Sequence, residues 1–139
     1  MNYMYKVGCS IENLKGVRDF IRGSLKGHDV SDIEISEIVL ALDEMCSNLM
    51  IHAHHCNPDD LFELHIQVDK GQPVIFEIID DGTVFDINQF NEPALNNIIH
   101  EKRKGGLGIR LVKSIMDKIE YQNRGGRNVC RLQKTVHFQ

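Results

Sequence analysis

The fold is decided by two runs of sequence, Phe62-Glu63-Leu64-His65-Ile66-Gln67-Val68 and Val74-Ile75-Phe76-Glu77-Ile78-Ile79, joined by Asp69-Lys70-Gly71-Gln72-Pro73. Apolar and polar side chains alternate in both runs, which is typical of strands with one buried face. A short connection that contains glycine and proline indicates an antiparallel hairpin. The sequence therefore predicts a sheet that is built largely from hairpins.

Two helices are expected before this hairpin. Residues 3–9 predict a short strand, and Ser10 is the expected N-cap of a first helix of about 15 residues. Ser31 begins a second helix with Glu34 completing a capping box, and this helix is expected to run to about His54. The predicted buried face of the second helix consists of Ile35, Ile38, Val39, Leu42, Met45, Cys46 and Leu49.

The remainder of the chain predicts a long connection, a helix and a closing hairpin. Residues 81–106 are mostly polar, with a short helix expected between Pro93 and His100, and such long segments are typically functional lids or disordered. The last helix is expected at 107–118 and the closing hairpin at 119–138. Strands joined mainly by hairpins predict an α/β fold with a mixed, mostly antiparallel sheet and helices on one face. A Rossmann or P-loop fold would need repeated βαβ crossovers.

Composition limits the class of protein. The 139 residues suit a single domain spanning 1–139, and 42% hydrophobic with 26% charged residues argue against disorder. A net charge of -4 argues against direct binding of nucleic acid. The cysteines have no paired spacing and are expected to be reduced thiols of a cytoplasmic protein. The start lacks a signal-peptide pattern, and the apolar runs are too short to cross a membrane.

Two polar residues lie one turn apart in the second predicted helix. In Leu40-Ala41-Leu42-Asp43-Glu44-Met45-Cys46-Ser47-Asn48-Leu49-Met50-Ile51-His52-Ala53, Glu44 and Asn48 share a strip beside the buried face. A carboxylate at such a boundary could deprotonate an attacking hydroxyl, and an amide oxygen one turn later could ligate Mg²⁺. Read alone, the pair is also typical of a solvated helix face.

Asp80-Asp81-Gly82 follows the second strand of the hairpin. A carboxylate at a strand end can accept a hydrogen bond from an exocyclic amine such as that of adenine, and Gly82 would let the backbone approach the base. The alternative is an ordinary Asp-Gly turn.

Gly105-Gly106-Leu107-Gly108 opens the last predicted helix. Exposed amides and the helix dipole at such a start favour a phosphate group, and Lys102, Arg103 and Lys104 add positive charge. The cluster is not a Walker motif, because no Gly-Lys-Ser/Thr follows.

A histidine-rich stretch, His52-Ala53-His54-His55-Cys56, suggests a metal site as an alternative. His52, His55 and Cys56 would share a helical face. A zinc site needs a further ligand or an open position, and polar histidines at a helix end are a simpler explanation.

Three motifs with matching contexts stand in order along the chain. They comprise Glu44, Asn48, His52 and Ala53 on the helix, Asp80, Gly82, Phe85 and Asp86 at the turn, and Gly106, Gly108 and residues 109–113 at the glycine cluster. Together they resemble the ATP-binding domain of the GHKL superfamily (gyrase, Hsp90, histidine kinase, MutL). Most closely, the chain resembles the stand-alone serine kinases that act as anti-sigma factors. Many members of the superfamily carry a second glycine where Val84 stands, whereas stand-alone kinases of this type often lack it.

The resemblance implies a Bergerat-type two-layer α/β sandwich that binds ATP and Mg²⁺. It implies that Glu44 activates the acceptor hydroxyl, that Asn48 holds Mg²⁺, and that residues 87–105 close over the triphosphate. Asp80 and Gly82 would then receive the adenine. The phosphates would lie against Lys104, Gly105, Gly106, Leu107 and Gly108.

The same resemblance implies an ATP-dependent serine/threonine protein kinase. Its acceptor would be a serine or threonine of a small antagonist protein, a sigma factor would be a competing partner, and the kinase would be a homodimer. The alternative from another class is a nucleotide-gated binding module that holds a partner with little or no kinase activity.

Overall fold

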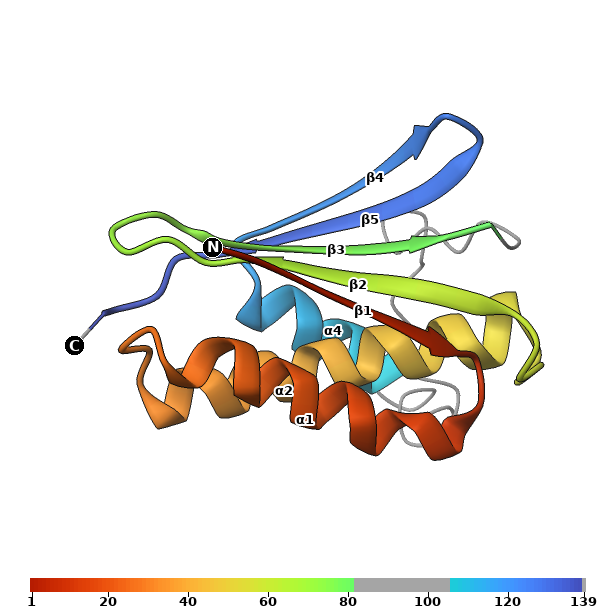
Figure 1. Ribbon diagram of the computed structural model, residues 1–139, viewed down its shortest axis with the longest axis horizontal. Coiled ribbons are helices and arrows are strands. Elements are labelled where there is room, and N and C mark those ends of the chain that lie inside the picture. Colours follow the sequence, from red (N-terminus) through yellow and green to blue (C-terminus); the bar gives the residue numbers. More distant parts are fainter. Residues whose placement is uncertain (82–105, 139) are drawn as a thin grey trace.

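The computed structural model describes residues 1–81 and 106–138, and these form two layers. The first layer is a five-stranded sheet of order β1-β2-β3-β5-β4, in which every pairing is antiparallel. The second layer consists of helices that cover one face of the sheet (Figure 1). The expected α/β sandwich is confirmed. The strands are β1 (Asn2–Gly8), β2 (Leu61–Gln67), β3 (Val74–Asp80), β4 (Lys118–Arg124) and β5 (Arg127–Lys134).

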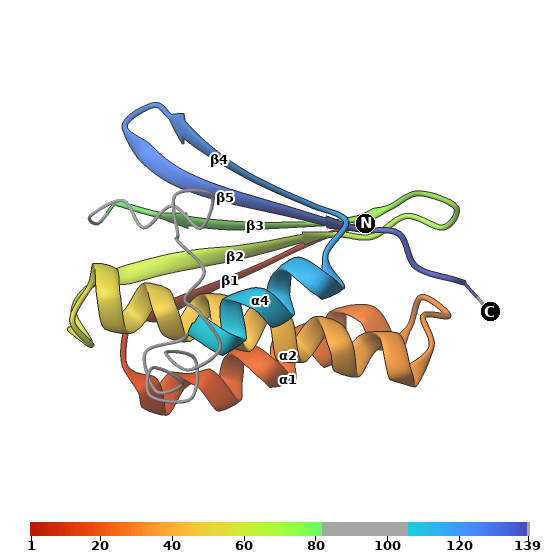
Figure 2. The ribbon, with the colours of Figure 1, turned by 180° about the vertical axis from the view of Figure 1, so that it is seen from behind.

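The helical layer contains α1 (Leu14–Lys26), α2 (Asp32–Asn48) and α4 (Gly106–Ile115). A 3-10 turn, Ile11–Asn13, leads into α1, and a π-helical turn, Leu49–Ala53, extends α2. Helix α2 packs against both α1 and α4, as the view from behind shows (Figure 2). The helix expected between Pro93 and His100, and the lid expected over 87–105, lie outside the described residues.

The start of α2 is capped as its sequence predicts. The Ser31 hydroxyl accepts a hydrogen bond from the Glu34 amide at 3.2 Å. The Glu34 carboxylate in turn accepts hydrogen bonds from the Ser31 hydroxyl and from the amide of His137, at 3.0 and 3.1 Å. The cap therefore also fastens the C-terminal segment to the helical layer.

The expected cap at Ser10 is wrong in detail. Ser10 makes no side-chain capping bond, and the chain passes through the 3-10 turn before α1 begins. The side chain of Asn13 instead donates to the Gly8 carbonyl at 2.9 Å, which holds the end of β1 against this turn.

The core lies between the sheet and the helices. All seven residues expected on the buried face of α2 are buried, which confirms the helical spacing read from the sequence. Phe62 of β2 and Phe76 of β3 are fully buried beneath the helices.

All four cysteines are free thiols, and Cys56 is the exposed one. Among the described helices, none has the length and apolar character required to cross a membrane.

Two glycines of α1 provide a test of this packing. An alanine Cβ at Gly16 would come 2.6 Å from the Tyr5 hydroxyl oxygen, and the Tyr5 ring stacks on Phe20 with centroids 5.1 Å apart. A Cβ at Gly23 would meet nothing within 4 Å. Gly23→Ala should raise the free energy of unfolding by about 0.5–1 kcal/mol, the usual gain from glycine to alanine within a helix.

Gly16→Ala should not show this increase in the free energy of unfolding, because the added Cβ would force the Tyr5 ring to move away from Phe20. Urea unfolding of the two variants compares the same substitution in the same helix. Equal stabilisation by both would contradict the packing of Tyr5 against α1.

Candidate functional site

The predicted site residues come from three elements that meet at one end of the helical layer. Glu44 and Asn48 lie in the C-terminal half of α2, Asp80 ends β3, and Gly108 is in the first turn of α4. Helix α2 joins the parts of the site, because it contacts α4 and also lines the recess that contains Asp80. Gly106 and Leu107 are the first residues of α4. The remaining predicted residues, Gly82, Lys104 and Gly105, lie outside the described residues.

Glu44 and Asn48 are joined as their spacing predicts. The Asn48 amide group Nδ2 donates a hydrogen bond to Glu44 Oε1 at 3.5 Å, and Asn48 is 2% exposed. Burial, followed by the nearby charge of Asp43, raises the pKa of the Glu44 carboxyl above its ordinary value, although the bond from Asn48 opposes this. A raised pKa makes a carboxylate a stronger proton acceptor.

Gly108 brings the backbone of α4 directly onto Glu44. A Cβ at this position would overlap the Glu44 carboxylate, so that any other residue would displace one of the two groups. The sequence assigned Gly108 to phosphate binding alone. The structure adds a packing requirement: the first turn of α4 can lie beside Glu44 and Asn48 only because this residue has no side chain.

Asp80 lies in a small recess between α2 and the sheet. It is 3% exposed and stands opposite Phe62 on β2 and Asn128 on β5 in the strand pairings. The recess has a volume of about 10 Å³, enough for about one water molecule. A carboxylate among mostly apolar side chains suits a flat ligand with a polar edge. Because the recess is small, the side chains that line it would have to move apart to admit such a ligand. The walls are formed by Met45, Leu49, Ile78, Tyr121, Asn128 and Cys130.

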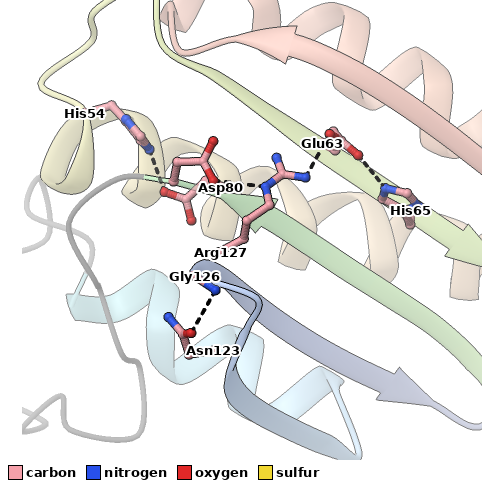
Figure 3. A network of polar contacts seen from close by, with 8 residues as sticks. His54, Glu63, His65, Asp80, Asn123, Gly126 and Arg127 are labelled. Atoms are coloured by element: carbon pink, nitrogen blue, oxygen red, sulfur yellow. Dashed lines mark hydrogen bonds and ion pairs between the residues drawn. The ribbon is translucent and has the colours of Figure 1, made fainter.

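His54 is a site residue that the sequence reasoning missed. It is 6% exposed, and its Nε2 lies 2.7 Å from Asp80 Oδ2 (Figure 3). Its Nδ1 lies 3.0 Å from Asp60 Oδ2. Its amide donates to the Leu49 carbonyl at 3.2 Å, the wider spacing of a π turn. This extra residue in the turn changes which side chains point inward.

The alternative of a metal site on a face formed by His52, His55 and Cys56 finds no support in the part of the chain that the structure describes. All three are exposed, whereas His54 is the histidine of this stretch that turns inward. Within residues 1–81 and 106–138, no group of three or more histidine, cysteine or acidic side chains is arranged to hold a metal ion. The helical face that was expected here is disrupted by the π turn.

An ion-pair network holds the chain just after Asp80. Arg127 donates to Asp81 Oδ1 at 2.9 Å and to Glu63 Oε2 at 3.2 Å, and Glu63 also lies 2.9 Å from a ring nitrogen of His65 (Figure 3). The same contacts lower the pKa of Glu63. Three strands therefore fix the position at which the long segment leaves the sheet.

Comparison with known proteins agrees with this arrangement. Residues 9–134 match the histidine kinase-like ATPase domain family. The chain is 30% identical over 105 residues to the serine-protein kinase RsbW of Halalkalibacterium halodurans, a match that covers 72% of this chain and 61% of that protein. It is 27% identical over 90 residues to the anti-sigma F factor of the same organism, covering 63% of this chain and 59% of that factor. The chain thus spans about three fifths of the curated relatives it matches.

Among solved structures, the RsbU and RsbW domains of a Mycobacterium tuberculosis protein share the fold. The TM-score is 0.66 at 14% identity, and the match covers 98% of this chain and 32% of that one. At this identity the likeness concerns the fold alone. The family match covers most of the chain and includes the three elements that carry Glu44, Asp80 and Gly108. The chain belongs to the histidine kinase-like ATPase domain family.

Proposed function

We propose that this domain transfers the terminal phosphoryl group of ATP to a serine or threonine hydroxyl of a partner protein. The observation that carries the proposal is the placement of Glu44, with its raised pKa, beside Asn48 and against the glycine-containing first turn of α4. Phosphoryl transfer requires mainly positioning and neutralisation of charge, and this arrangement offers groups for both. The name of the RsbW relative supports the same reaction.

Each described group has a separate role in this proposal. Glu44 accepts the proton of the attacking hydroxyl. Since Asn48 Nδ2 faces Glu44, its amide oxygen is the atom that would hold Mg²⁺, which prefers oxygen ligands and would neutralise charge on the phosphates. The amides at the start of α4, from Gly106 to Gly108, face the phosphates, with Lys104 and Gly105 as predicted neighbours.

The base of the nucleotide would enter the recess that contains Asp80. A buried carboxylate can accept a hydrogen bond from the amino group of adenine, and the apolar walls from Met45, Leu49 and Ile78 can cover the faces of the ring. Gly82 remains the predicted point of close backbone approach.

The partner is proposed from the named relatives. A serine-protein kinase and an anti-sigma factor among them support a small antagonist protein as the acceptor and a sigma factor as a competing partner. A homodimer as the working form stays a prediction from the resemblance of the sequence. A second candidate function is a nucleotide-gated binding module without transfer. It is favoured by the contact of Glu44 with Gly108, because the α4 backbone covers the carboxylate that would act as the base.

Asn48→Ala is the first test. The variant should fold normally and lose transfer from Mg-ATP, because the metal and the triphosphate would no longer be held together. The assay uses the antagonist co-purified from the native host and follows phosphoserine or phosphothreonine by mass spectrometry. Unchanged phosphorylation by the variant would contradict the proposed mechanism, and stable partner binding without transfer by the wild type would favour the binding module.

Glu44→Gln tests the effect of the Glu44 carboxylate on the rate of transfer and, separately, on the stability of the domain. Loss of the proton acceptor should slow transfer by about 10²–10⁴-fold. Because the pKa of Glu44 is raised above its ordinary 4.5, its ionised form destabilises the folded domain at neutral pH. The variant should therefore be more stable than the wild type at pH 7, and this difference should vanish below pH 4.5. A variant that is less stable at neutral pH would contradict the burial of Glu44.

Gly108→Ala tests the contact between α4 and Glu44. The added Cβ should displace the carboxylate, which is the end of a flexible side chain, so that transfer falls by about 10²-fold with little loss of stability. Gly23→Ala is the matched control, since it adds the same methyl group where nothing lies within 4 Å. Equal transfer rates for the two variants would show that Gly108 does not position Glu44.

A further inference from the structure

We propose that the acceptor protein docks on the outer face of α1 and α2, with an apolar side chain on Leu40 and carboxylates beside the cations of α1. The inference rests on the proposed function, because it takes Glu44 as the point at which transfer occurs. It deepens that function by naming the surface and the chemistry of the partner that fits it. The docking face consists of five exposed residues: Arg22, Lys26, Ile33, Glu37 and Leu40.

The apolar part of the docking face is a line of side chains on α2 that leads to Glu44. Leu40 is 52% exposed, and Ile33, two turns earlier, is 76% exposed. Residues 33, 37, 40 and 44 have the spacing that places side chains along one side of a helix. At a rise of about 1.5 Å per residue, Leu40 is about 6 Å and Ile33 about 16 Å from Glu44 along the helix axis. The proposed proton acceptor therefore has an exposed leucine one turn away.

A protein that delivers a hydroxyl to Glu44 has to cover Leu40. Among the described elements, the backbone of α4 at Gly108 lies on one side of the Glu44 carboxylate, and buried residues of α2 such as Met45 lie toward the core. A specific protein interface covers about 800 Å² on each partner, which is far more than one helical turn. An apolar side chain of the acceptor protein that packs on Leu40 would remove both groups from water.

Helix α1 adds positive charge to the docking face. Four of its 13 residues are lysine or arginine and one is acidic, although the whole chain has a net charge of -4. Lys15 is paired with Asp19 of the same helix at 3.4 Å. In the part of the chain that the structure describes, neither Arg22 nor Lys26 forms an ion pair. Their charges are therefore available to a partner.

The ion pair between Arg18 and Asp43 shows where these cations lie relative to Leu40. It joins α1 to α2 at 2.8 Å, and the two helices lie side by side and run in opposite directions (Figure 1). Arg22 follows Arg18 by one turn, and Leu40 precedes Asp43 by about one turn. Because the helices are antiparallel, both steps lead the same way. Arg22 and Leu40 therefore lie at the same level of the helical layer.

The charges of the docking face indicate the character of the partner. Arg22 and Lys26 face solvent with one acid of the docking face, Glu37, which is also unpaired among the described residues. Cations that border an exposed leucine complement a protein segment that carries an apolar side chain and more than one carboxylate. We expect such a segment beside the acceptor serine or threonine.

Leu40→Gln tests the apolar contact in the full chain. Glutamine keeps the helix propensity and adds no charge beside Glu44. Leu61→Gln is the matched control, because Leu61 is 47% exposed but lies on β2, on the face of the sheet away from the helices. The probe is the co-purified protein that gains phosphoserine or phosphothreonine. Its KM should rise by about tenfold or more in Leu40→Gln, with kcat and the KM for Mg-ATP unchanged, and Leu61→Gln should match the wild type.

Arg22→Glu tests the charge of the docking face. Lys70→Glu is its control, because it changes the net charge equally, and Lys70 is exposed in the β2–β3 connection and unpaired among the described residues. Arg22→Glu should raise the KM for the same protein by about fivefold or more and weaken its dependence on salt. Equal effects of the two variants would overturn the assignment of carboxylates to the partner.

Equilibrium binding of the co-purified protein, measured without ATP, separates this inference from the proposed function. Weaker binding to Leu40→Gln, and not to Leu61→Gln, would support the docking face, and absence of transfer by the wild type would then overturn the proposed function alone. Transfer with the same KM and binding in both variants would overturn the inference and leave the proposed function standing.

Light scattering of the same variants tests a second occupant of the docking face. A change in oligomeric state in Leu40→Gln with unchanged binding of the co-purified protein would assign this face to contact between copies of the chain, and would overturn the inference. The expected result is the wild-type oligomeric state in both leucine variants.

Discussion

The site depends on the close approach of two helices, where the backbone of α4 at Gly108 lies directly on the carboxylate of Glu44. Buried residues on both helices hold this approach, including Met45 of α2 and Ile109 and Val112 of α4. The contact buries Glu44 and so contributes to the desolvation that raises its pKa. It also places the first turn of α4 against α2, the helix that carries Asn48. The absence of a side chain at Gly108 therefore has two effects. It lets α4 pack closely against α2, and it lets the same contact bury the Glu44 carboxylate.

The second carboxylate of the site, Asp80, has a contrasting environment. Glu44 is partly buried beside another acid, whereas Asp80 is buried against the ring of His54. In the proposed mechanism, surroundings of opposite character would let two acids on one fold take different roles, one as proton acceptor and one as a fixed hydrogen-bond acceptor. The antiparallel sheet supports this division, because β2 and β5 hold Asp80 from both sides and Arg127 fixes the residue that follows it.

Much of the fold could be predicted because its signals are local and periodic. The hairpin of β2 and β3, the Ser31 cap and the buried face of α2 follow from alternation, capping and helical spacing, and the structure confirms them. The relation of Glu44 to Asn48 follows from the same spacing. His54 could not be found this way, because a π turn alters the periodicity at that point. The contact of Gly108 with Glu44 joins residues 64 positions apart, and no local pattern in the sequence reports it.

The central claim is that Glu44 accepts the proton of the attacking hydroxyl, and the pH dependence of a single turnover tests it most directly. Labelled ATP is mixed with excess wild-type domain and its co-purified partner, and the rate of phosphoryl transfer is followed from acid to neutral pH. The account predicts a rate that falls as pH is lowered through an apparent pKa above 4.5, the ordinary value for a glutamate. A rate that does not change across this range, or the absence of transfer at any pH, would contradict it.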